Sequence, residues 1–111
     1  MGWDFDLLKS GKNFKRIDFD GEVLTLVPAK YEIDDSLAVQ AWGDWEPYGT
    51  LTVNLGEEDL PEHYAYFNIN MYRGPELLEV LENASIINGT QKTKKSGFVT
   101  YPLVRWNLED L

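Results

Sequence analysis

An alternating run of eight residues, Tyr48 to Leu55, limits the possible folds of this chain more than any other stretch. Its aliphatic residues Leu51, Val53 and Leu55 alternate with threonine and asparagine. Successive side chains of a strand point to opposite faces of a sheet. The pattern therefore predicts one strand with an aliphatic face and a polar face, and the rest of the chain is expected to cover the aliphatic face.

Further strands are predicted on both sides of this central run. Asp20-Gly21 lies between two apolar runs and predicts a hairpin, because a two-residue type I′ turn needs positive φ at both positions. Pro28 is expected to end or bulge the second strand, since proline donates no ladder hydrogen bond. Residues 37–42 are predicted to pair with the central run through the connection 43–47. The other expected strands cover residues 14–19, 23–27, 64–70 and 98–106.

One short amphipathic helix is predicted from Pro75 to Ala84. Proline suits the first helical position, and its leucines fall on one face. Asn88-Gly89 reads as a turn, residues 90–97 read as a basic surface loop, and Pro102 indicates an edge position or a bulge in the last strand. The predicted fold class is α+β: a mainly antiparallel sheet of about five to six strands, joined as meander hairpins and covered by this helix. We expect a single domain, 1–111, with residues 1–13 as an N-terminal extension.

Charge is strongly unbalanced, with 19 acidic and 10 basic side chains, a net charge of −9 and a pI near 4.4. Between Ile17 and Gln91 there are 15 acidic residues against only Lys30 and Arg73. Such a surface repels nucleic acid and anionic membranes, so we expect direct contact with neither. Either the acidity serves solubility alone, or the surface competes for a basic groove on a protein.

The residue types available for catalysis are few. The chain has no cysteine, which excludes a disulfide, a thiolate zinc site and a cysteine nucleophile. His63 is the only histidine, and we expect an exposed loop residue beside Glu62 rather than a catalytic base. The carboxylates of residues 57–62 do not have the spacing of a calcium loop. We expect a non-enzymatic protein without cofactor or metal, and a cytoplasmic one, since the sequence shows neither a signal peptide nor a long apolar run.

Three stretches carry a family resemblance: Pro-Tyr-Gly-Thr-Leu-Thr-Val-Asn-Leu at 47–55, Pro-Glu-Leu-Leu-Glu-Val-Leu-Glu at 75–82, and Ser-Gly-Phe-Val-Thr-Tyr-Pro-Leu at 96–103. In this order and spacing the chain resembles a family of small acidic proteins of unknown function, encoded on conjugative transposons, plasmids and phages of Gram-positive bacteria. The resemblance covers Phe14 to Trp106. It implies a cargo protein of mobile DNA and supplies no catalytic residues.

That context favours an inhibitor of host defence, either anti-CRISPR or anti-restriction, which binds a protein with a basic surface such as a nuclease. The alternative is an accessory protein-interaction module of plasmid transfer or maintenance, whose acidity serves only solubility. A small-molecule binder or hydrolase with a pocket lined by Tyr64, Tyr66 and Trp106 is a third class, and an exposed edge at 98–106 leaves dimerisation open. Trp45 is the expected aromatic anchor. The expected partner-binding acids are Asp34, Asp35, Asp44, Glu46, Glu57, Glu58, Asp59 and Glu62.

Overall fold

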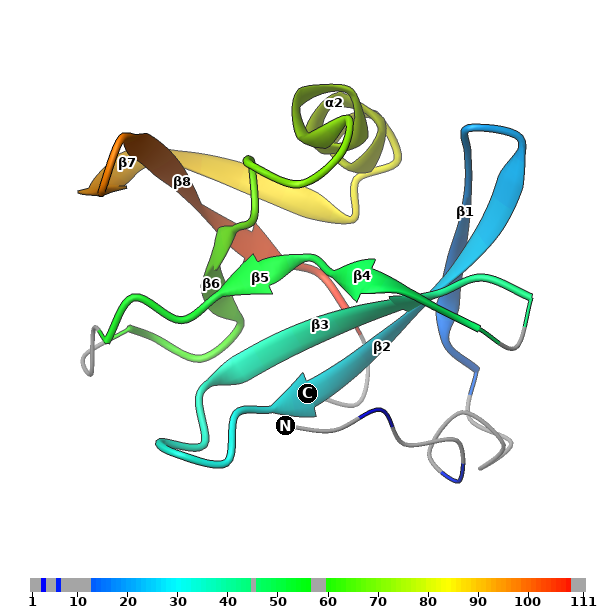
Figure 1. Cartoon of the computed structure of the whole chain (residues 1–111), viewed down its shortest axis with the longest axis horizontal. Helices are drawn as coiled ribbons and strands as arrows, with labels where there is room; N and C mark the ends of the chain where they lie inside the picture. Colours follow the sequence, from blue (N-terminus) through cyan, green and yellow to red (C-terminus); the bar gives the residue numbers. More distant parts are fainter. Residues whose placement is uncertain (1–2, 4–5, 7–12, 45, 57–59, 109–111) are drawn as a thin grey trace.

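The structure, a computed structural model, describes residues 3, 6, 13–44, 46–56 and 60–108. These residues form eight strands and the helix α2, which confirms the α+β class (Figure 1). The elements are β1 (Lys15–Phe19), β2 (Glu22–Lys30), β3 (Leu37–Trp42), β4 (Pro47–Thr50), β5 (Thr52–Val53), β6 (Tyr64–Phe67), α2 (Gly74–Asn83), β7 (Ile87–Ser96) and β8 (Val99–Trp106).

The strands form two antiparallel sheets rather than the single sheet of five to six strands that we predicted. The first sheet has the order β1-β2-β3-β4 and the second has the order β5-β6-β8-β7. One apolar core contains buried side chains of both sheets and of α2. A smaller cluster of Phe14, Val27 and Trp42 lies apart from it, and the Trp3 ring meets the Trp42 ring edge-on at 5.0 Å.

Leu51 is the residue at which the chain passes from one sheet to the other. Its N–H donates to the Val39 carbonyl at 2.8 Å, and its own carbonyl accepts from the Asn68 N–H at 2.8 Å. The central strand predicted at 48–55 is therefore divided into β4 and β5. The predicted polar face also fails at Thr52, which is only 3% exposed, because this crossing is covered on both sides.

The predicted hairpins of the first sheet are present. Asp20 and Gly21 have φ values of 55° and 76°, as a type I′ turn requires. β3 pairs with β4 as expected. Pro28, however, does not end or bulge β2: it pairs in register opposite Val39. The pairing of β1 stops at Leu26, so the missing proline N–H is tolerated where β2 has a neighbour on one side only.

Residues with left-handed backbone conformation mark both ends of helix α2. Arg73 at the N-cap is left-handed, with φ of 54°. A Cβ on Gly74 would lie 2.2 Å from the Ile69 carbonyl oxygen, so only glycine fits this start. At the other end Ser85 has φ of 60°, and its N–H and that of Ile86 bond back into the last turn, as in a Schellman motif.

Residues 90–96 of the basic segment belong to strand β7, so the predictions of a loop there and of a turn at Asn88-Gly89 are wrong. β7 forms one edge of the second sheet and is exposed along most of its length, with only Ile87 fully buried. An edge strand exposed on both faces has no apolar alternation to reveal it. β8 is accordingly an inner strand, yet Pro102 lies beyond its last pair with β6 and again has one neighbouring strand.

Candidate functional site

The acidic residues of the β2–β3 turn have structural roles. Asp34 Oδ1 accepts from the Ser36 N–H at 3.0 Å and from the Ser36 hydroxyl at 2.7 Å, while Oδ2 accepts from Asn54 Nδ2 at 3.1 Å. These bonds, the one from the Ser36 hydroxyl first, lower the pKa of Asp34. Asp35 adopts φ of 57°, a conformation that aspartate tolerates better than most residues. Both side chains are exposed, but turn geometry already accounts for their presence.

A second group of carboxylates gathers where the β1–β2 hairpin meets the β3–β4 turn. Glu22 Oε1 would lie 2.1 Å from a Cβ on Gly43, so its carboxylate lies directly against that turn. The Gly43 N–H donates to the Glu46 carbonyl at 2.8 Å and closes the turn around Asp44. All four acidic side chains are exposed. We name this group the acidic patch; its members are Asp20, Glu22, Asp44 and Glu46.

Tyrosines lie beside the acidic patch. Burial raises the pKa of Tyr48 first, and the charges of Asp20 and Glu22 raise it further, which places that phenol in a negative environment. Tyr72 is 76% exposed. Arg73 is the cation of this region: it pairs with Asp20 and lies over the Phe19 ring, 5.1 Å from its centroid. The site thus combines carboxylates, two phenols and one arginine already engaged.

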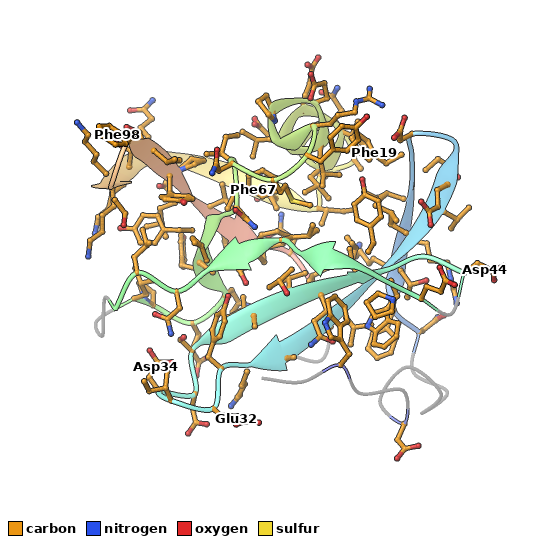
Figure 2. The ribbon with its side chains drawn as sticks, in the orientation of Figure 1. Phe19, Glu32, Asp34, Asp44, Phe67 and Phe98 are labelled. Atoms are coloured by element: carbon orange, nitrogen blue, oxygen red, sulfur yellow. The ribbon has the colours of Figure 1, made fainter. Side chains whose placement is uncertain are left out.

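The predicted acidic residues do not form one surface. Figure 2 shows Asp34 and Asp44 at opposite ends of the β2–β3 hairpin. Glu62 is exposed in the turn before β6. The structure therefore brings Asp44 and Glu46 together and leaves Asp34, Asp35 and Glu62 elsewhere. Four predicted residues lie outside the described ones: Trp45, Glu57, Glu58 and Asp59.

Asp20 and Glu22 were missed as site residues, because the Asp-Gly pair was interpreted only as a turn signal. The sequence did carry a usable clue. An exposed hairpin tip with acids on both sides of its glycine has more charge than the turn itself needs, since Asp20 and Gly21 alone satisfy the type I′ geometry.

The aromatic residues of β6 do not create a deep pocket with Trp106. Tyr31, Tyr64 and Tyr66 line one hollow. Its volume of about 20 Å³ holds little more than one water molecule. Trp106 is fully buried and donates from Nε1 to the Ala65 carbonyl at 3.4 Å. The hollow that the described residues form at Tyr64 and Tyr66 is therefore much smaller than the deep pocket expected for a small-molecule binder.

His63 differs from its predicted exposed position. Its side chain is half-buried, and its Nδ1 is buried without a hydrogen-bond partner in the described part of the chain. The described residues contain no group of three or more histidine, aspartate or glutamate side chains arranged to hold a metal ion. None of the described helices is long and apolar enough to cross a membrane.

Fold and surface together define a small α+β protein of two antiparallel sheets, with exposed carboxylates in the turns that join its strands. Residues 25–111 match the model of a domain of unknown function (DUF4313), and the chain belongs to that family. The match begins inside β2, so β1 and the segment before it lie outside the matched range. No curated protein and no solved structure matches the chain.

Proposed function

We propose that this chain is a non-enzymatic protein of a mobile genetic element that binds a protein partner with a basic surface. The observation that carries the proposal is the acidic patch, in which exposed carboxylates from two separate turns lie beside half-buried Tyr48 and near exposed Tyr72. Carboxylates of this kind steer a basic partner by long-range attraction and raise the association rate. Tyrosine is enriched among the residues that dominate interface energetics, because it buries a large surface with little loss of freedom.

Within this class, we favour an inhibitor that occupies the basic nucleic-acid groove of a host defence nuclease. A groove lined by lysine and arginine binds phosphates through counterion release, and a protein carboxylate surface competes for the same cations. Three of the four patch carboxylates, those of Glu22, Asp44 and Glu46, have no cation assigned among the described contacts and are available to such a groove.

The test compares capture of partners from host lysate, at low and raised salt, by the wild-type chain and by two triple variants. Glu22→Gln/Asp44→Asn/Glu46→Gln removes three patch charges and keeps Asp20, which pairs with Arg73. Glu76→Gln/Glu79→Gln/Glu82→Gln removes three exposed charges from α2 and is the matched control. We expect the patch variant to bind on the order of tenfold more weakly and the control to bind like wild type. Equal retention by both variants would exclude the acidic patch as the contact.

The accessory module of plasmid transfer or maintenance is the second candidate, and the exposure of Tyr72 favours it. In that case Tyr72→Ala weakens capture, whereas raising the salt concentration and neutralising the patch leave it unchanged. Recovery of a nuclease that is lost at raised salt supports the inhibitor, and recovery of a transfer or replication protein at both salt concentrations supports the module.

A further inference from the structure

The outer half of the β7–β8 hairpin extends beyond the strands beside it. The last pair between β6 and β8 is Tyr66 with Leu103, whereas β7 continues to pair with β8 from Thr93 to Ser96. β8 begins at Val99, four residues before Leu103, and this span corresponds to about 13 Å at the rise of a strand. We name residues 93–102 the hairpin arm; Figure 1 shows it at the margin of the fold.

The hairpin that forms this arm has the opposite charge to the rest of the chain. Residues 87–106 contain four basic side chains and no acidic one, a net charge of +4. The remainder of the chain therefore has a net charge of −13, and the two parts together give the total net charge of −9. At physiological salt charges are screened over about 8 Å, so the tip of the arm is largely shielded from the acids of the body. The basic residues are Lys92, Lys94, Lys95 and Arg105.

An aromatic side chain stands at the tip. Ser96 pairs with Val99, which leaves a two-residue turn of Gly97 and Phe98, and Gly97 has φ of 62°. Phe98 is fully exposed, at 104% of its reference area, and points away from the body (Figure 2). Lysines on an edge strand prevent pairing with other chains. Edge protection does not account for Phe98, because that residue lies in the turn and not on the edge.

We propose that the hairpin arm binds single-stranded nucleic acid, with the Phe98 ring stacked on a base and the lysines of β7 on neighbouring phosphates. Stacked aromatic rings beside cationic side chains are the recurring means of binding single strands without sequence preference. A single exposed ring requires an unpaired base, which favours a single strand over a duplex. The expectation of no nucleic-acid contact came from the net charge of the whole chain, and the separation of charge between arm and body removes its basis.

The proposal is tested by the fluorescence anisotropy of a labelled oligothymidine of about 12 nucleotides, with salt varied between about 50 and 200 mM. We expect wild type to bind with a slope of log K against log salt of about −1.4, from the two lysines of the arm, Lys94 and Lys95, at about 0.7 each. Phe98→Ala is expected to weaken binding by roughly 5- to 100-fold, and Phe98→Trp to preserve it. Lys95→Gln is expected to reduce the slope by about 0.7.

Matched controls come from the opposite hairpin. Ile33 is an exposed aliphatic residue of the β2–β3 turn, and Lys30 is an exposed lysine at the end of β2. Ile33→Ala and Lys30→Gln are expected to bind the oligonucleotide like wild type. Absence of binding by the wild-type chain, or equal affinities for Phe98→Ala and Ile33→Ala, would overturn the proposal.

A basic hairpin tip with an aromatic side chain could also bind an anionic membrane. Binding to vesicles that contain anionic lipid is therefore measured beside binding to the oligonucleotide. Binding to these vesicles with none to the oligonucleotide would replace the nucleic-acid proposal with a membrane one. The result is independent of the proposed function, because the acidic patch triple variant leaves the arm unchanged and is expected to bind the oligonucleotide at least as well as wild type.

Discussion

Replacing Thr52 with valine should lower the free energy of unfolding by roughly 2 to 3 kcal/mol, although valine has nearly the same shape. Thr52 Oγ1 accepts from the buried Val39 N–H at 3.2 Å and lies 3.1 Å from the Tyr31 hydroxyl. Valine leaves the Val39 N–H without its acceptor, which costs about 1 to 3 kcal/mol in a buried site. The loss at Tyr31 is smaller, because its hydroxyl keeps the Thr52 carbonyl at 3.2 Å.

Urea unfolding followed by tryptophan fluorescence measures this change. The expected loss corresponds to a fall in Tm of about 10 to 20 °C for a chain of this size. Thr50→Val is the matched control, since the Thr50 side chain makes no hydrogen bond in the described part of the chain, and it should change stability by less than about 0.5 kcal/mol. If the free energy of unfolding of Thr52→Val lies within about 0.5 kcal/mol of the wild-type value, the Thr52 hydroxyl does not satisfy the Val39 N–H and the reasoning is wrong.

Tyr31→Phe completes a double-mutant cycle with Thr52→Val. A coupling energy of about 0.5 to 1.5 kcal/mol is expected from the shared hydrogen bond. The tyrosine also gives a signature in alkali. Burial raises the pKa of Tyr31 above its ordinary value near 10. Its contribution to stability is therefore complete below that value and is lost as pH rises toward the folded-state pKa, a loss that Tyr31→Phe should lack.

Four other substitutions test the fold. Leu51→Ala should lower the free energy of unfolding by about 2 to 5 kcal/mol in urea unfolding, because the fully buried leucine packs at the junction of both sheets. Ser85→Gly should raise stability by about 0.5 to 1 kcal/mol, because glycine adopts φ of 60° without strain, whereas Asn83→Gly within α2 should lower it. Asp34→Asn should flatten the acid limb of the stability profile: the lowered pKa of Asp34 contributes stability above its ordinary value near 4 that is lost as pH falls.

Short sequence patterns predicted those elements whose geometry is determined by residues adjacent in the sequence. The Asp20-Gly21 turn and the pairing of β3 with β4 follow from turn chemistry, and α2 from proline at its start and leucine spacing. The features that the sequence did not predict depend on tertiary packing. The crossing at Leu51 leaves the alternation of 48–55 intact in the sequence while dividing it between two sheets. β7 was invisible because a strand buried on neither face needs no apolar period.

The candidate site was harder to predict than the fold, because its residues come from distant turns. Asp44 and Glu46 were expected, but their neighbour Glu22 lies some twenty positions earlier, and only the packing of the β1–β2 hairpin on the β3–β4 turn brings it there. For Asp34, its place in a polar turn predicts a binding role, and the structure adds hydrogen bonds to Ser36 and Asn54 that give its carboxylate a structural role as well.

The range of the family match bears differently on the two proposed surfaces. Asp20 and Glu22 lie outside the matched residues 25–111, on the hairpin whose first strand brings Ile17 and Phe19 to the core. The acidic patch is therefore complete only in a chain that also has the β1–β2 hairpin. The hairpin arm lies entirely inside the matched range. If both proposals hold, nucleic-acid binding should extend to family members with a basic β7 and an aromatic tip, whereas the protein partner should differ wherever the first hairpin differs.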